Sequence, residues 1–172
     1  MIPYIEYMVK YFTKHNETMK TSLTAASHHL FKIREGAIVL EVTQANIYHN
    51  FVSKSLFDTN IERLDIHTAV AFIKMWLRYP YEDDWKKLAR MMRYLCGTPE
   101  LPITLRANRT NIFKLWLDSY NGVHPNCGGR IRATQSLVKI LTISTYTKQK
   151  LNNSSSTETE LVAEYDIMPH AI

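Results

Sequence analysis

The chain has 172 residues, and its 45% hydrophobic content, with ten tyrosines, six phenylalanines and three tryptophans, excludes an intrinsically disordered protein. Its formal charge of +5 suits a partner that carries phosphates, although many proteins without such a partner have a similar charge. Two cysteines, Cys96 and Cys127, exclude a disulfide framework and a cysteine zinc site, and no apolar run reaches the roughly 20 residues of a membrane span.

The first hundred residues carry helical periodicity. Apolar residues recur at helical spacing over residues 3–14 and again from Thr43 to Leu56, and the residues between these segments read as mostly irregular. A further helix begins at about Asp65 and ends before Pro80, because proline disfavours helical geometry in the residue that precedes it. Residues 81–97 predict a helix with acidic residues in its first turn and an apolar stripe that packs in a core: Trp85, Leu88, Met91, Met92 and Leu95.

After Pro102 the periodicity changes from helical to alternating. Residues 103–105, 111–119, 128–138 and 139–149 combine apolar and β-branched residues and predict strands, and the chain then returns to helix. A helical half followed by strands and a helix predicts an α+β fold.

Asp118 closes the apolar run that begins at Ile112. Aspartate is depleted in strands because a carboxylate loses hydration there. Asp118 is therefore either at the exposed end of its strand, opening a turn, or held by a cation.

The segment "LNNSSSTETELVAEYD" contains two possible starts for the last helix. Ser-x-x-Glu is the spacing of a capping box, and both Ser155 with Glu158 and Thr157 with Glu160 have hydroxyl and carboxylate three residues apart. If Ser155 is the cap, Glu160 is free to face a neighbour. If Thr157 is the cap, Glu160 has a structural role.

Three blocks occur in the order and spacing of the C-terminal part of a copia-type retrotransposon Pol polyprotein: "DDWKKLARMMRYLCGTPEL", "LWLDSYNGVHPNCGG" and "TKQKLNNSSSTETELVAE". Two earlier pieces, "YHNFVSKSLF" and "ERLDIHTAVAF", resemble the helical segment that follows the polymerase palm in that family. The resemblance covers about residues 40–170. Ordered blocks of this kind are more specific than any one motif.

The resemblance implies two parts. Residues 1–102 would be the mostly helical C-terminal connection segment of a reverse transcriptase. Residues 103–172 would be a truncated ribonuclease H-like domain of three antiparallel strands and a helix. In the family, an aspartate on the first strand and a glutamate on the first helix bind catalytic Mg²⁺, and these positions correspond to Asp118 and Glu160. Carboxylates suit two hard cations that activate a water and stabilise the leaving oxygen of a phosphodiester.

The intact parent of such a fragment copies RNA into DNA and hydrolyses the RNA of RNA–DNA hybrids. This chain lacks the polymerase palm and the later acids of the ribonuclease H site, so we expect a catalytically incomplete fragment that holds Mg²⁺ weakly or not at all. Two alternatives remain open: a non-catalytic, retroelement-derived nucleic-acid-binding protein, or the product of an unexpressed pseudogene.

Four basic residues near the predicted sheet edge could meet a phosphate backbone: Arg130, Arg132, Lys148 and Lys150. An ordinary solvated basic face is the alternative. The expected partners are an RNA–DNA hybrid or another nucleic acid and the remainder of the Pol polyprotein, with no membrane. Because the N-terminal sequence does not resemble a signal peptide and no disulfide framework is present, we expect an intracellular protein, cytoplasmic or nuclear, and not a secreted one.

Overall fold

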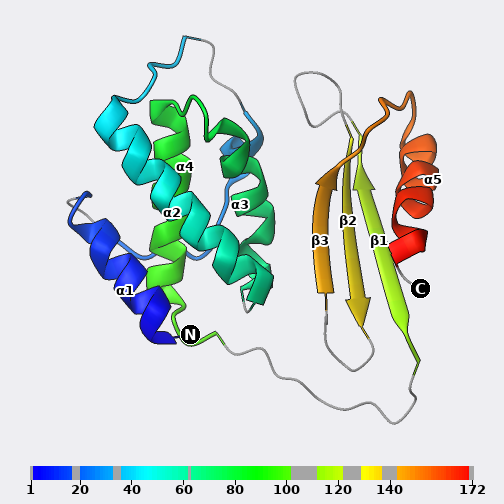
Figure 1. Ribbon diagram of the computed structural model, residues 1–172, viewed down its shortest axis with the longest axis horizontal. Coiled ribbons are helices and arrows are strands. Elements are labelled where there is room, and N and C mark those ends of the chain that lie inside the picture. The colour runs from blue at the N-terminus through cyan, green and yellow to red at the C-terminus, as the bar shows by residue number, and fades with distance from the viewer. Residues whose placement is uncertain are drawn as a thin grey trace. The chain divides into compact units, whose positions relative to one another are not determined.

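The computed structural model describes residues 2–16, 20–32, 36–61, 63–101, 112–121, 129–136 and 143–170. The chain divides into two compact units, Met1–Pro102 and Ile103–Ile172 (Figure 1). We call the first the helical unit and the second the sheet unit. The predicted strand at residues 103–105 and the cysteine Cys127 lie outside the described residues.

In its described residues, the helical unit contains four α-helices: α1 (Ile2–Thr13), α2 (Val42–Ile61), α3 (His67–Ile73) and α4 (Glu82–Gly97). Short 3₁₀ turns stand at His28–Phe31, Leu64–Ile66 and Lys74–Trp76. Helix α4 packs against α1, α2 and α3 (Figure 1). None of the helices in the described residues is both long and apolar enough to cross a membrane.

The apolar stripes predicted for α1 and α4 form the centre of this unit. On α1, the buried residues recur at helical spacing: Ile5, Met8, Val9 and Phe12. On α4, Leu88, Met91, Met92 and Leu95 are fully buried, and the Trp85 ring stacks on Phe12 with ring centroids 5.4 Å apart. The prediction that the α4 stripe is core is confirmed.

The segment from Asp65 to Pro80 differs from its prediction as one helix. Only His67–Ile73 is α-helical, and 3₁₀ turns flank it on both sides. Such turns are common at helix ends, where the hydrogen-bonding pattern tightens. The helical geometry therefore ends at Trp76, well before Pro80.

Arg63 fastens the connection between α2 and α3 to the end of α4. It is 2% exposed, and its guanidinium donates to both carboxylate oxygens of Asp65, at 2.9 and 2.8 Å. It also donates to the Thr98 carbonyl at 2.7 Å and to the Thr98 hydroxyl at 2.9 Å. The Tyr94 hydroxyl donates to Asp65 at 2.7 Å, so the buried Arg63 is paired with a carboxylate that is itself hydrogen-bonded.

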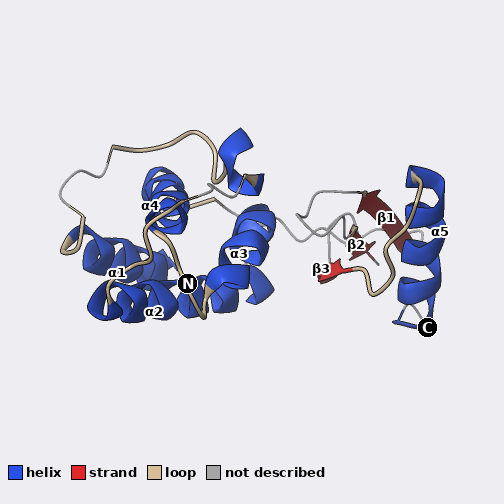
Figure 2. Ribbon diagram, turned by 90° about the horizontal axis from the view of Figure 1, so that it is seen from above, coloured by secondary structure: helices blue, strands red, loops and turns tan. Residues whose placement is uncertain are grey.

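The sheet unit consists of three antiparallel strands and a helix. Strands β1 (Lys114–Tyr120), β2 (Arg130–Ser136) and β3 (Ile143–Lys148) pair in that order, and α5 (Ser156–Ile167) ends in a 3₁₀ turn, Met168–His170. Together the two units confirm the predicted α+β class. Figures 1 and 2 show α5 lying along one face of the sheet.

The two faces of the sheet differ in character because successive side chains on a strand point to opposite sides. Beneath α5, Ile131 and Ala133 of β2 form a small core with Ala163 and Ile167 of α5, and Leu115 and Leu117 of β1 pack against it. The register pairs Asp118 with Arg132 and Arg132 with Tyr146. These alternate residues belong to the opposite face, which we call the open face.

Candidate functional site

Asp118 lies within β1 and not at its end, since the strand continues to Tyr120. Its side chain is exposed, and its strand partner is the cationic Arg132. A hydrogen bond with the Asp118 carboxylate, together with burial, raises the pKa of the Tyr120 hydroxyl. This bond joins alternate residues of one strand, which agrees with an Asp118 side chain on the open face.

Helix α5 begins with Ser155 as its N-cap, so the first of the two capping alternatives is the one that forms. The Ser155 hydroxyl accepts from the Glu158 N–H at 3.2 Å. The Glu158 carboxylate accepts from the Ser154 N–H at 2.9 Å and from the Ser154 hydroxyl at 2.8 Å, one residue earlier than in a standard capping box. These hydrogen bonds lower the pKa of Glu158. Glu160 has no part in this cap and is exposed.

A depression of about 170 Å³ lies between β1 and α5. Its lining includes both predicted acids and one further glutamate: Leu117, Asp118, Ser119, Glu160, Ala163 and Glu164. The structure therefore brings Asp118 and Glu160 to the borders of one depression. The Ser119 hydroxyl oxygen is buried there without a hydrogen-bond partner among the described residues.

The fit of these acids to Mg²⁺ is limited. Within the described part of the chain, no three His, Cys, Asp or Glu residues come together in a group that could hold a metal ion. Alternation along β1 also places the Asp118 side chain on the face away from α5, whereas Glu160 belongs to α5. As they stand, these residues do not form the ligand set of a two-metal site, and the roles of Asp118 and Glu160 as catalytic metal ligands stay predictions.

The four predicted nucleic-acid-binding residues have different environments. Lys148 and Lys150 are exposed, and Arg132 is half-buried. Arg130 is buried, with its guanidinium 5.2 Å from the centroid of the Tyr146 ring, and burial lowers its pKa. Arg130 therefore supports Tyr146, while the exposed charge belongs mainly to the two lysines.

Gln149, in the middle of the "TKQK" motif, joins the sheet to the start of α5. Its buried amide donates to the Thr159 carbonyl at 2.6 Å and accepts from Asn153 at 3.0 Å, and its backbone N–H donates to Gly129 at 3.0 Å. A Cβ atom at Gly129 would stand 2.1 Å from the Gln149 side-chain oxygen. The motif thus includes a positioning residue that sequence reasoning did not single out.

Aromatic side chains accompany the charges of the open face. Trp116 is 52% exposed and Tyr120 is 45% exposed, and both share this face with Asp118. Burial raises the pKa of the neighbouring Tyr146 to about 12. Sequence reasoning missed these rings, although aromatic residues at alternate positions beside Asp118 would have been the signal.

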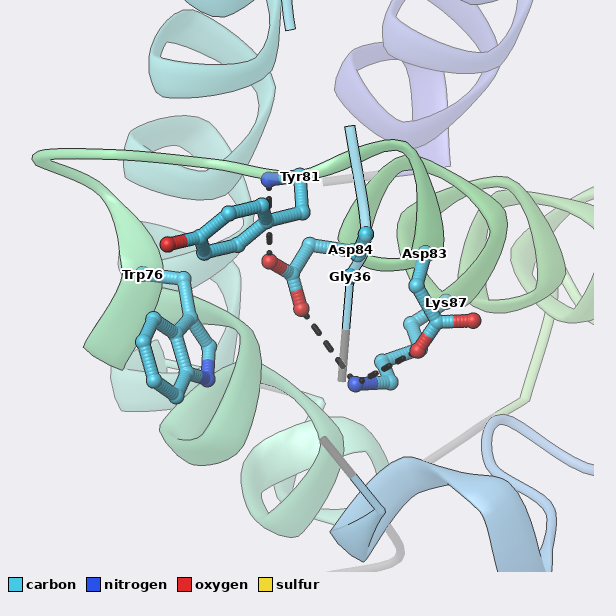
Figure 3. Close-up of a pocket in the computed structure, with 7 residues that line it drawn as sticks. Gly36, Trp76, Tyr81, Asp83, Asp84 and Lys87 are labelled. Atoms are coloured by element: carbon cyan, nitrogen blue, oxygen red, sulfur yellow. Dashed lines mark hydrogen bonds and ion pairs between the residues drawn. The ribbon is translucent and has the colours of Figure 1, made fainter. Parts of the chain in front are cut away.

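The helical unit contains a second cavity, of about 260 Å³, shown in Figure 3. Lys87 lies between two carboxylates, with its Nζ 3.1 Å from Asp83 and 3.3 Å from Asp84, and it also donates to the Lys32 carbonyl at 3.0 Å. Burial raises the pKa of Asp84 despite these contacts. The charges of the cavity are paired with one another, which indicates a structural role.

Comparisons of the chain with models of protein families, with curated proteins and with solved structures find no match. The features that bear on function are therefore the depression beside Asp118 and the charged, aromatic open face. Both belong to the sheet unit.

Proposed function

We propose that the chain is the C-terminal part of a copia-type retroelement reverse transcriptase. In this proposal, the helical unit is the connection segment and the sheet unit is a ribonuclease H-like domain that holds an RNA–DNA hybrid. The supporting observation is the depression that Asp118 of the first strand and Glu160 of the following helix border together. The ordered sequence blocks described above support the same ancestry.

Binding without efficient cleavage is the activity that these residues support best. Mg²⁺, when bound in such a domain, would supply a nucleophile and stabilise charge on the leaving oxygen. Among the described residues, Asp118, Glu160 and Glu164 are the acids that border the depression, and the Asp118 carboxylate belongs to the opposite face of the sheet. We therefore expect weak Mg²⁺ binding and little or no nuclease activity.

The hybrid would be held through its phosphates. Lys148 and Lys150 are exposed and stand at and just beyond the end of β3, with Arg132 on the adjacent strand. Such contacts position a duplex without reading its sequence. Arg130 contributes indirectly, through Tyr146.

Binding to a short fluorescent RNA–DNA hybrid, measured by anisotropy with the full chain, tests this proposal. Affinity should fall steeply between about 50 and about 200 mM salt, because bound counterions are released. The double variant Lys148→Gln/Lys150→Gln should bind more weakly and reduce the salt slope by about 1–2. Lys10→Gln/Lys86→Gln, which removes two exposed lysines of the helical unit, is the matched control. Absent or salt-independent binding would refute the proposal.

Cleavage of the same hybrid in Mg²⁺ separates the fragment from an active enzyme. We expect the wild-type chain and Asp118→Asn to leave the RNA strand equally intact. Robust cleavage that Asp118→Asn abolishes would show that the chain is an active ribonuclease H, contrary to the proposal.

A further inference from the structure

We propose that the open face of the sheet binds single-stranded nucleic acid, with unpaired bases stacked on Trp116 and Tyr120. This inference rests on the proposed function only in the class of ligand, a nucleic acid. It adds a different binding mode and different residues. Exposed aromatic rings beside cationic side chains are the two elements that bind single strands without sequence preference.

The two rings are exposed and belong to the same strand. Trp116 and Tyr120 are four residues apart on β1, which corresponds to about 13 Å along an extended chain. Stacked bases in a duplex follow one another at about 3.4 Å, and their faces are covered by neighbouring bases. Rings at this separation therefore suit bases that have been spread apart, and not those of an intact hybrid.

The surrounding residues hold the face in place. Tyr120 is two residues from Asp118 on the same strand, so both side chains lie on this face. On the adjacent strands, Arg130 lies over the Tyr146 ring at 5.2 Å, and both side chains are buried. A platform fixed in this way loses little conformational freedom when a base stacks on it.

The charge of the face favours a phosphate-bearing occupant. By strand register and alternation, Lys114, Arg132 and Lys148 of the described strands share this face with the Asp118 carboxylate, whereas Arg130, which also belongs to it, is buried. Lys114 and Lys148 are exposed. A polynucleotide supplies both the negative charges and the flat apolar groups that these side chains complement.

The test is anisotropy with the full chain and a labelled oligouridine of about 12 nucleotides, which is within the site size of single-strand-binding domains. Trp116→Ala should weaken binding roughly 5- to 100-fold, the usual effect of removing one stacking ring. Trp116→Phe keeps a ring and should lose much less. Neither variant should change the affinity for the RNA–DNA hybrid by more than about twofold, because duplex bases cannot reach the ring.

Tyr165→Ala is the matched control, because Tyr165 is 80% exposed on α5, away from the open face. Its affinity for the oligouridine should equal that of the wild type. Asp118→Asn should bind the single strand about twofold to fivefold more tightly, since it removes the one negative charge of the face. Thermal melts of each variant verify that the sheet unit is folded.

The outcomes separate the two proposals. Loss of hybrid binding alone would refute the proposed function and leave this inference standing. Equal affinity of wild type and Trp116→Ala for the oligouridine would refute the inference, as would equal losses in Trp116→Ala and Tyr165→Ala. A wild-type dimer in light scattering that Trp116→Ala dissociates would assign the open face to a second copy of the chain instead.

Discussion

The helical unit and the sheet unit are stabilised in different ways. The helical unit completely buries large side chains, among them Phe12, Tyr48 and Phe51. Among the described residues, the core cluster of the sheet unit has four buried members, and two of them are alanines, Ala133 and Ala163. Since buried apolar area provides most of the stability of a domain, the helical unit has the larger hydrophobic reserve.

Hydrogen bonds compensate for part of this difference in the sheet unit. Gln149 joins β3, Gly129 and the first turn of α5, and Ser155 caps that helix. Helix α5 buries Thr159, Ala163 and Ile167 and leaves Leu161 and Tyr165 exposed. The sheet unit, which has the smaller apolar core, also contains the predicted site. The stability of the sheet unit therefore depends on polar contacts near functional residues.

The largest effect should come from Arg63→Ala in the helical unit. Removing the guanidinium leaves the Thr98 carbonyl without a donor and empties the buried space that Arg63 fills, and we expect a loss of about 2–4 kcal/mol in the free energy of unfolding. Urea unfolding followed by the fluorescence of Trp76 and Trp85, in a Trp116→Phe background, reports on this unit alone.

Arg78→Ala is the control for this prediction, because Arg78 is an exposed arginine of the same unit. It should cost less than about 1 kcal/mol. A loss of similar size in both variants would mean that the Arg63 network contributes no more than a surface charge.

An intermediate effect is expected from Gly129→Ala in the sheet unit. The new Cβ atom would clash with the Gln149 oxygen at 2.1 Å and crowd the Tyr120 carbonyl at 3.1 Å, and overpacking of this kind costs about 1–3 kcal/mol. The midpoint urea concentration reported by Trp116 fluorescence should fall, whereas the midpoint reported by Trp76 and Trp85 should not change. A shift in both signals would show that the two units unfold together.

The smallest expected effect is on the pH dependence of the stability of the helical unit, where the pKa values of two aspartates are shifted in opposite directions. Burial disfavours the charged form of Asp65, but hydrogen bonds from Arg63 and Tyr94 outweigh it and lower its pKa. Its stabilising contribution is present above the unfolded pKa of about 4 and is lost as the pH falls through the lower folded value. Burial raises the pKa of Asp84, so its contribution is lost as the pH rises through that higher value.

Melting temperatures of the helical unit, measured between about pH 3 and about pH 7, test the directions of these two pKa shifts. Asp65→Asn should flatten the decrease at the acidic end, and Asp84→Asn should flatten the decrease above about pH 4. The same change in both variants at every pH would contradict the opposite shifts.

Periodicity in the sequence was sufficient for most of the fold. The stripes of α1 and α4 and the β1–β2–β3–α5 order follow from apolar residues at helical or alternating spacing. The burial of Arg63 and Lys87 could not be predicted, because charged residues are normally exposed. Their acceptors, the carbonyls of Thr98 and Lys32, are distant in sequence.

The candidate site was predictable only in part. The cap at Ser155 could not be separated from one at Thr157, since both have a glutamate three residues later. The sheet face on which Asp118 lies could be predicted from the sequence, because Leu115 and Leu117 indicate the face that a helix must cover. Alternation alone therefore argues against a carboxylate that points directly at α5.

The order of the strands also bears on how the sheet unit folds. Strands β1, β2 and β3 pair with their neighbours in sequence, and α5 follows directly to cover them. Each step closes a short loop, for which the entropic cost is small, so the contact order of the unit is low for a β-rich structure. The three strands can therefore assemble from residues near one another in the chain.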